Sequence, residues 1–290
     1  RDAGVDFVLS EPGQMRSIPG LSGSIVVEFC SPHIRCLWPE LHGMGVRLIH
    51  SPTMAGFEVY ERELAFHAPP AAIHYQSHYL QQASRLQWEE AGVCVHETIH
   101  GAFDPSQFPW NPLPRDGPFH IGRLARVHRS KWNPNLFDII GKVRGKGVDA
   151  YLACQGWTYD LTVHCGNPPA FATCLPAGTN PPQEFYSQCH AIICPNWSVA
   201  ENWPRIGLEA MACGVAIVAD KAGGWEEMID SGYSGYLCSN QKEFVSRLVE
   251  LAEHEDVRQM MISNAYTKLQ SLCNPDDLGE QWTSLFAKVA

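Results

Sequence analysis

The chain has 290 residues, of which 45% are hydrophobic and 18% charged, and its formal net charge is −10. This length suits two domains better than one, and the acidic balance excludes non-specific nucleic-acid binding, which needs a basic face. Its 11 cysteines are an odd number without a C-x-x-C pair, which favours free thiols in a reducing cytosol over a disulfide scaffold. We therefore expect a cytoplasmic globular protein without a transmembrane segment, and peripheral membrane contact stays open.

The first 104 residues alternate short apolar stretches with polar or helical ones. Strands are expected at residues 6–10, 24–29, 46–50, 72–75 and 93–99. Residues 81–91 have the pattern of a helix, and strands that alternate with helices indicate βα units around a parallel sheet. The sequence opens almost directly into the first strand, so we expect the chain to begin inside a domain.

Residues 96–100, His-Glu-Thr-Ile-His, match the H-E-x-x-H pattern, which on a helix places two zinc ligands and a general base on one face. The β-branched residues before and within this stretch favour a strand instead. On a strand, residues four apart lie about 13 Å from each other, too far to share one zinc ion. A third ligand at the usual spacings is also missing, so we expect a strand end that binds no metal.

Residues 104–118 contain five prolines and cannot form a helix or a central strand, so we expect a connector between two domains. The alternation then restarts. Further strands are expected at residues 119–122, 150–153, 190–194 and 215–219. Helices are expected at residues 135–143, 205–213, 257–272 and 278–287. Gly214 closes one of these helices, and Asn240 with Glu243 opens another as an N-cap and its N3 partner.

Two acidic residues follow a strand of the second half. Glu201 lies in the loop after that strand, and Glu209 lies early in the next helix. A loop at the carboxyl end of a parallel strand, leading into a helix, is where α/β sheets bind ligands. The free N–H groups of the first helical turn favour a phosphate, and a carboxylate can accept hydrogen bonds from vicinal hydroxyls such as those of a ribose.

Positive charges gather at the end of another strand in the same half. Five Lys and Arg residues occur between Arg115 and Lys131, in a chain that is otherwise acidic. A single cation in a loop is usually just solvated, whereas a cluster at the carboxyl end of a strand fits a diphosphate.

Four features together resemble retaining GT-B glycosyltransferases of family four, the glycosyl transferases group 1. They are the Glu-x7-Glu spacing of Glu201 and Glu209, the Leu-Glu-Ala-Met-Ala-Cys-Gly run at 208–214, the Gly-Gly-x-x-Glu at 223–227, and the Gly-Arg…Lys series from 122 to 131. Residues 99–108 are similar to the strand that precedes the linker in this family. The resemblance covers about residues 70–270 and is most specific over 201–235.

The resemblance implies where the diphosphate of a donor would bind. Arg123 and Lys131, with Gly122 before them, would hold the diphosphate and take part in catalysis. The backbone N–H groups of Arg205 and Ile206 would lie near the same phosphate.

The resemblance also implies roles for residues near the sugar. Glu209 would bind the ribose hydroxyls, and Glu201 would contact the hydroxyls of the transferred sugar as a catalytic residue. A histidine of the first domain often faces the donor sugar in this family, and His33 and His50 both match loosely. Glu227 matches the last residue of the Gly-Gly-x-x-Glu motif, whose role is structural.

The chain departs from the family pattern at three places. The first βα unit of the family, with its glycine-rich loop, has no counterpart here. Pro204 replaces a more usual glycine, which removes one N–H donor. The spacing from Gly-Arg to Lys131 is longer than usual, so Arg129 is an alternative to Lys131.

The implied fold is α/β and GT-B, with two Rossmann-like domains, a cleft between them, and a first domain that is incomplete at its amino terminus. We expect an acceptor-side domain at residues 1–110 and a nucleotide-sugar-binding domain at 111–275. A final helix at 276–290 would pack back on the first domain.

The implied activity is transfer of a sugar from a UDP- or GDP-sugar to an unknown acceptor (a glycan, a lipid or a small molecule), with retention of anomeric configuration. We expect no cofactor and no metal, and the sequence contains no D-x-D. Two alternatives are an epimerase or hydrolase of nucleotide sugars on the same fold, and an inactive module that only binds them.

Overall fold

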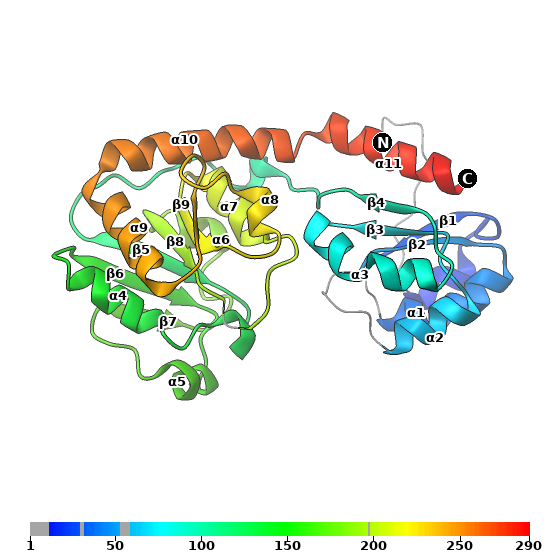
Figure 1. The fold of residues 1–290 in the computed structure, drawn as a ribbon, viewed down its shortest axis with the longest axis horizontal. Helices are drawn as coiled ribbons and strands as arrows, with labels where there is room; N and C mark the ends of the chain where they lie inside the picture. Colours follow the sequence, from blue (N-terminus) through cyan, green and yellow to red (C-terminus); the bar gives the residue numbers. More distant parts are fainter. Residues whose placement is uncertain (1–11, 30–31, 53–58, 197) are drawn as a thin grey trace. The chain divides into compact units, whose positions relative to one another are not determined.

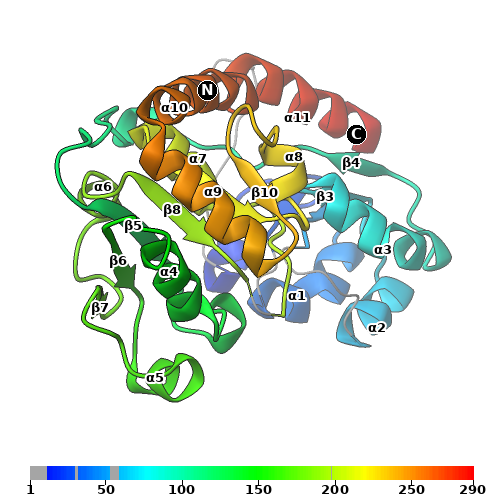
Figure 2. The same cartoon turned by 60° about the vertical axis from the view of Figure 1, so that its left-hand side comes forward.

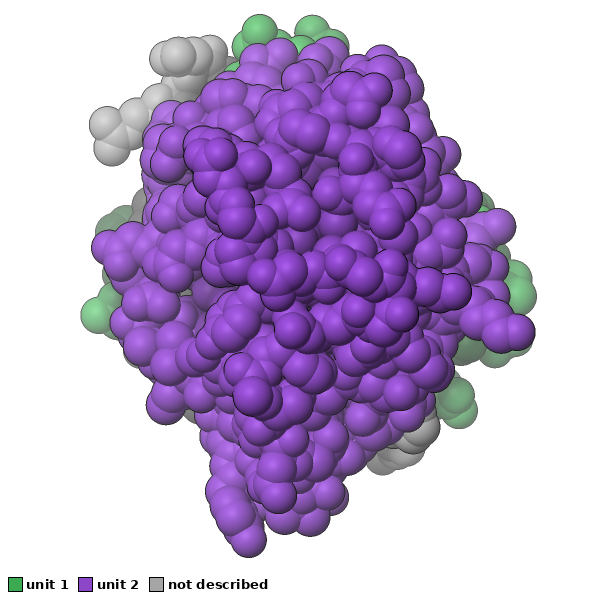
Figure 3. Space-filling model, turned by 90° about the vertical axis from the view of Figure 1, so that its left-hand side faces the viewer, with its two compact units in different colours: residues 1–102, 274–290 green, residues 103–273 purple. Residues whose placement is uncertain are grey.

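The structure is a computed structural model that describes residues 12–29, 32–52, 59–196 and 198–290. The chain divides into two compact units (Figure 3): unit 1 comprises residues 1–102 and 274–290, and unit 2 comprises residues 103–273. The sequence placed the boundary at 110/111, eight residues later. Among the described residues, no helix combines the length and the apolar character that crossing a bilayer requires.

Unit 1 is built on a parallel sheet of four strands in the order β1-β2-β3-β4. The strands are β1 (Ile25–Glu28), β2 (Arg47–His50), β3 (Ala72–Tyr75) and β4 (His96–Thr98). The helices are η1 (Pro12–Ser17), α1 (Pro32–Gly43), α2 (Val59–His67), α3 (His78–Glu90) and α11 (Pro275–Val289). The strand expected at residues 6–10 lies outside the described residues.

Helix α3 shows how the local sequence fixes an element of unit 1. The Ser77 side chain accepts a hydrogen bond from the Leu80 N–H at 3.1 Å and so caps the first turn. Leu80, Ser84 and Trp88 follow at spacings of four and form the buried face of the helix.

The H-E-x-x-H stretch forms strand β4, which pairs in parallel with β3, so the prediction of a strand is confirmed. The ring of His96 is held in place from both sides. Its Nδ1 lies 3.1 Å from the Tyr75 hydroxyl, and its Nε2 lies 2.9 Å from the Val93 carbonyl oxygen. The two histidines of the motif therefore do not share a helical face.

The last helix, α11, packs on the sheet of unit 1 (Figure 1). Leu285 and Val289 join a buried cluster with Ile49 of β2 and Ile99, which follows β4. Lys288 also forms an ion pair of 2.7 Å with Glu97. The burial of this apolar face ties the end of the chain to its first third.

Unit 2 contains a parallel sheet of six strands in the order β10-β9-β8-β5-β6-β7. The strands are β5 (Phe119–Leu124), β6 (Ala150–Gln155), β7 (Ala172–Leu175), β8 (Ala191–Cys194), β9 (Ala216–Asp220) and β10 (Tyr236–Cys238). The helices are η2 (Pro105–Gln107), η3 (Arg129–Lys131), α4 (Leu136–Arg144), α5 (Tyr159–Cys165), α6 (Pro182–Tyr186), α7 (Arg205–Cys213), α8 (Trp225–Met228), α9 (Gln241–Glu253) and α10 (Glu255–Leu272).

Helices cover both faces of this sheet, which makes unit 2 a three-layer α/β structure (Figures 1 and 2). One buried cluster holds the apolar faces of α4, α5 and α9 against the strands, and a second holds those of α6, α7 and α10. The strand order reverses beside β5, which pairs with β6 on one side and β8 on the other. In such sheets, ligands bind at the carboxyl ends of the strands where the order reverses.

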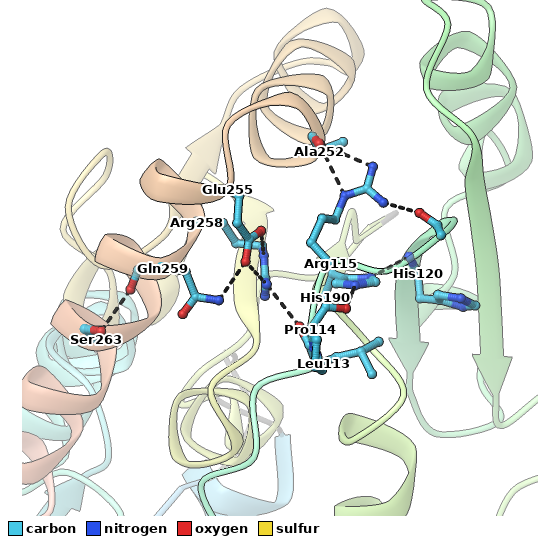
Figure 4. Close-up of polar contacts among 11 residues, drawn as sticks. Leu113, Pro114, Arg115, His120, His190, Ala252, Glu255, Arg258, Gln259 and Ser263 are labelled. Atoms are coloured by element: carbon cyan, nitrogen blue, oxygen red, sulfur yellow. Dashed lines mark hydrogen bonds and ion pairs between the residues drawn. The ribbon is translucent and has the colours of Figure 1, made fainter.

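The proline-rich segment is fixed to unit 2 because side chains of that unit donate hydrogen bonds to carbonyl groups of the segment (Figure 4). Arg258 of α10 donates to the Leu113 carbonyl at 3.0 Å, and His190 donates from Nε2 to the Pro114 carbonyl at 2.9 Å. Phe103 and Phe108 are buried in the second cluster of unit 2. The segment therefore forms part of unit 2 and is not a separate connector.

Candidate functional site

Strand β5 brings Gly122 and Arg123 to the point where the strand order of unit 2 reverses. Gly122 is buried, and a Cβ placed there would lie 2.5 Å from the Cys189 sulfur and 2.9 Å from the Phe185 ring. Because α6 and the residues after it pack directly on this point, the absence of a side chain at Gly122 serves close packing.

The Arg123 guanidinium lies in a polar cluster at the end of β5. We use this name for Arg123, Lys131, Asn196, Glu201 and Asp220. Arg123 is only 2% exposed. Its Nη2 donates to the Lys131 carbonyl and, at 3.2 Å, to Oδ1 of Asn196. The guanidinium also lies 5.7 Å from the centre of the Trp132 ring. Arg123 thus connects the loop after β5 with Asn196, two residues after the end of β8.

Lys131 and Glu201 form an ion pair at the same edge of the sheet. The Lys131 Nζ lies 2.7 Å from Oε2 of Glu201, and the two side chains are 14% and 21% exposed. Lys131 ends the short helix η3, whose first residue is Arg129. Arg129 is exposed, so it is Lys131 that the fold places against Glu201.

The loop that carries Glu201 is fixed by the two glycines of the Gly-Gly-x-x-Glu motif. The Gly224 N–H donates to the Glu201 carbonyl at 2.8 Å. A Cβ at Gly223 would lie 2.4 Å from that carbonyl oxygen, and one at Gly224 would lie 1.7 Å from the Asn202 carbonyl oxygen. The motif therefore requires glycine because two backbone segments touch there.

Helix α7 begins at Arg205, directly after Pro204, and ends at Cys213. Gly214 follows with a φ of 75°, the left-handed conformation of a helix C-terminus. The first N–H groups of a helix have no partner within the helix, and those of Arg205 and Ile206 belong to this turn. The turn follows the Glu201 loop, so it adds a positive partial charge to the same edge of the sheet.

Glu209 lies one turn further into α7. Its Oε2 accepts a hydrogen bond of 2.8 Å from the Tyr186 hydroxyl. Burial raises the pKa of Glu209, and the Tyr186 hydroxyl and the charge of Arg205 oppose that change. Burial and the neighbouring carboxylate raise the pKa of Tyr186, so the phenol keeps its proton and acts as the donor.

The two candidate histidines lie in unit 1. His33 belongs to the first turn of α1, and its side chain lies outside the described part of the structure. His50 is fully buried, with Nδ1 2.5 Å from a Glu28 oxygen and Nε2 3.2 Å from a Glu61 oxygen. Burial alone lowers the pKa of His50, but the two carboxylates outweigh it and raise that pKa above its ordinary value. His50 therefore offers no free ring nitrogen to a ligand.

Two residues of the polar cluster were not predicted from the sequence. The Asn196 N–H donates to Oδ2 of Asp220, the last residue of β9. Burial raises the pKa of Asp220 to about 6, against the lowering by the Asn196 N–H and Arg123. Both residues lie at or just after the carboxyl end of a buried strand, and that position was a usable signal. Tyr186 carried no comparable signal.

Comparisons with known proteins bear on the fold and on part of unit 2. Residues 174–268 match the family described as Glycosyl transferases group 1. The matched residues all lie in unit 2. The match includes β8 to β10, α7 and the loop of Glu201, so it contains the part of the sheet at which the acidic residues were predicted.

Two curated relatives of this chain are matched over short segments. An uncharacterized glycosyltransferase, MJ1178, from Methanocaldococcus jannaschii is 28% identical over 82 residues, which is 28% of this chain and 23% of the relative. The D-inositol 3-phosphate glycosyltransferase of Stackebrandtia nassauensis is 28% identical over 105 residues, or 36% and 22% of the two chains. The matched segments thus span less than a quarter of each relative.

Solved structures match over nearly the whole chain. Anabaena HepE in complex with UDP is similar with a TM-score of 0.73 and 16% identity, covering 96% of this chain and 84% of that one. TarM is similar with a TM-score of 0.74 and 15% identity, covering 95% and 57%. The fold is therefore α/β with parallel sheets, as in GT-B glycosyltransferases, and the predicted fold class is confirmed.

Proposed function

We propose that this protein is a glycosyltransferase that takes a sugar from a UDP- or GDP-sugar and moves it to an acceptor. The observation that carries the proposal is the cluster of Arg123, Lys131 and Glu201 at the strand reversal of unit 2. Residues 174–268 of the same unit match the Glycosyl transferases group 1 family. Anabaena HepE, which has a similar fold, was solved with UDP. The acceptor is a glycan, a lipid or a small molecule.

The diphosphate of the donor would meet positive charge from three sources. Lys131 is the more exposed of the two cations, and Arg123 adds a second charge while holding the Lys131 carbonyl. The first turn of α7 contributes the N–H groups of Arg205 and Ile206. Together these groups favour a diphosphate over a neutral ligand.

The ion pair between Lys131 and Glu201 would change partners when the donor binds. The diphosphate would take Lys131, because it carries two negative charges and the carboxylate carries one. Glu201 would then be free to accept hydrogen bonds from hydroxyls of the transferred sugar. Glu209, held by Tyr186 through one oxygen, would use its other oxygen to bind the ribose.

The proposed reaction keeps the anomeric configuration. The acceptor oxygen attacks the sugar from the side of the leaving diphosphate, a new C–O bond forms as the bond to phosphate breaks, and the leaving phosphate oxygen takes the proton of the acceptor. Charge grows on the diphosphate as it leaves. Arg123 and Lys131 stabilise that charge electrostatically. The proposed mechanism uses no metal ion.

A donor screen tests this proposal. The protein is incubated with UDP- and GDP-sugars, with and without a mixture of glycan and lipid acceptors, and release of the nucleoside diphosphate is measured. Release that depends on an acceptor, persists in EDTA and is lost in Lys131→Ala would support the proposal. The exposed Lys242→Ala serves as the matched control.

The same screen separates the alternatives. Turnover of the donor without any acceptor indicates an epimerase or a hydrolase. Binding of donors in calorimetry without turnover indicates an inactive binding module. Loss of activity in EDTA that Mg²⁺ or Mn²⁺ restores would contradict the metal-free mechanism.

A further inference from the structure

Asn196 lies at the centre of the polar cluster of unit 2, two residues after the end of β8. Its Oδ1 accepts the hydrogen bond from Nη2 of Arg123 at 3.2 Å. A guanidinium only donates, so the oxygen of the amide must face Arg123 and Nδ2 must face away. The orientation of the Asn196 side chain is thus determined by Arg123.

The backbone of Asn196 is held on both sides. Its N–H donates to Oδ2 of Asp220 at the end of β9, and its carbonyl accepts from Nδ2 of Asn133 at 3.3 Å. Asn133 lies two residues after Lys131. Asn196 therefore joins the carboxyl ends of β5, β8 and β9 to the loop that carries Lys131.

The side-chain nitrogen of Asn196 is the part of this residue that makes no hydrogen bond among the described residues. Its Nδ2 is buried and, within the described parts of the chain, has no hydrogen-bond partner. A buried donor without a partner lowers stability and needs an explanation other than folding. A smaller residue at this position would avoid that cost, but it would lose the acceptor for Arg123.

We propose that Asn196 is a positioning residue for diphosphate binding: it holds the Arg123 guanidinium beside the Lys131 loop in the orientation that the donor meets. This inference rests on the proposed function. Without Oδ1, Nη2 of Arg123 loses one of its acceptors and keeps the Lys131 carbonyl, and the guanidinium can turn toward Asp220 or Glu201. Either carboxylate would take the positive charge that the diphosphate needs.

The test compares affinity and stability in Asn196→Ala. Binding of UDP and of GDP is measured by calorimetry, and thermal unfolding is followed on the same samples. We expect affinity for the nucleotide that binds to fall roughly tenfold, the usual scale for a lost charge-assisted hydrogen bond. We expect the melting temperature to stay unchanged or to rise, because the unpaired Nδ2 is also removed.

Asn264→Ala is the matched control. The Asn264 side chain also makes a hydrogen bond within unit 2, in which its Nδ2 donates to the Tyr233 carbonyl at 3.2 Å, but Asn264 lies on α10. We expect the Asn264→Ala variant to bind the nucleotide with the affinity of the wild-type protein. Should Asn196→Ala not fold, Asn196→Ser shortens the side chain and removes the amide, and it provides the same comparison.

A double-mutant cycle shows whether Asn196 acts through Arg123. In an Arg123→Lys background the geometry that Asn196 maintains is already lost, so adding Asn196→Ala should change affinity by less than twofold. An equal loss in both backgrounds would overturn the proposal. A lower melting temperature with unchanged affinity would also overturn it, because Asn196 would then be purely structural.

The outcomes also separate this inference from the proposed function. If the wild-type protein binds neither UDP nor GDP, the proposed function fails and this inference fails with it. If the wild-type protein binds and Asn196→Ala binds equally well, the proposed function stands and only this inference is overturned.

Discussion

At the scale of single residues, the two acidic side chains of the candidate site are held by different partners. Glu201 pairs with the Lys131 ammonium group, and Glu209 accepts the Tyr186 hydroxyl. The first contact is an ion pair near the surface, and the second is a hydrogen bond within the more buried part of unit 2. The two partners can therefore be removed independently.

We predict that Glu209→Ala weakens donor binding roughly ten- to a hundred-fold, because it removes a charged hydrogen-bond acceptor worth about 1.5–3 kcal/mol. Tyr186→Phe should cost less, about 1 kcal/mol or roughly fivefold, since the carboxylate stays and only its orientation is relaxed. Calorimetry with UDP and GDP measures both. Tyr233→Phe, on an exposed tyrosine, is the control. Unchanged binding in Glu209→Ala would remove Glu209 from the site.

We predict that Arg123→Lys lowers kcat by about two orders of magnitude. The change keeps one positive charge but loses the planar group that bonds both the Lys131 carbonyl and Asn196. Because charge grows on the leaving diphosphate, the loss should fall on kcat more than on KM. Steady-state kinetics on protein of verified melting temperature measures it. An unchanged kcat would mean that Arg123 serves only the fold.

At the scale of elements, the loop after β8 depends on the start of α8. Gly224 has an ordinary helical φ of −64°, so glycine is not needed there for its conformation. It is needed for space, because the Asn202 carbonyl occupies the position of a side chain. The loop that carries Glu201 thus takes its shape from a helix that lies beyond the next strand.

We predict that Gly224→Ala destabilises the protein by roughly 1–3 kcal/mol and displaces Glu201, so that donor affinity also falls. Gly141→Ala is the control, since a Cβ there would meet only the Phe171 ring at 3.9 Å in the middle of α4. Alanine is the better helix former, so that variant should be neutral or more stable. Chemical denaturation of both variants provides the measurement. Equal stability of the two would contradict the packing argument.

Elements with strong local signals were predicted well. The prediction of a helix over 205–213 agrees with α7 at both ends, and Gly214 in the left-handed conformation is the local signal for its carboxyl end. The prediction of a strand over 72–75 agrees with β3. Strand β7 was missed, because it lies at the edge of its sheet and its four residues are only half-buried. The short helix α8 was missed because four residues give no periodicity.

At the scale of the whole molecule, each unit contains a buried histidine that stays neutral. In unit 1, His74 lies 2.8 Å from both the Ser51 hydroxyl and the Ile99 carbonyl oxygen. In unit 2, His190 accepts the His120 N–H through Nδ1 (Figure 4). Burial lowers the pKa of each to about 4. His50 is the opposite case, since its two carboxylates raise its pKa.

We predict that these histidines limit stability on both sides of neutrality. As the pH falls from about 6.5 toward 4, His74 and His190 bind protons in the unfolded chain but stay neutral in the native protein. The free energy of unfolding therefore decreases. The stability that His50 contributes is complete below about pH 6.5, and it is lost as the pH rises through its raised native pKa. Thermal unfolding from pH 4 to pH 9 measures both limbs.

Variants assign the two limbs. His50→Gln should reduce the loss of stability on the alkaline side, and His190→Gln should reduce the loss of stability on the acidic side. The raised pKa of Asp220 partly offsets the acidic loss in the wild-type protein, because native Asp220 binds a proton at a higher pH than the unfolded chain does. His42→Gln, on an exposed histidine, should leave the shape of the curve unchanged. An alkaline limb of equal slope in His50→Gln would contradict the assignment.

The sequence by itself determined the alternation of strands and helices and the residues that end them. Apolar periodicity, prolines and glycines act over a few residues, so a single stretch contains the whole signal. That was sufficient to predict Arg123, Lys131, Glu201 and Glu209 as candidates and to identify residues 96–98 as a strand. The motifs around Glu209 were also sufficient to predict the fold class, through the resemblance that they carry.

Only the tertiary structure decided which of these residues meet. Lys131 and Glu201 are 70 residues apart, and Arg123 and Asn196 are 73 apart. They come together because β5 pairs with β8, and that choice depends on how the helices bury both faces of the sheet. No local pattern encodes the neighbour of a strand. For the same reason the burial of His50 between two carboxylates was beyond prediction, since it follows from the packing of β1, β2 and α2 around one ring.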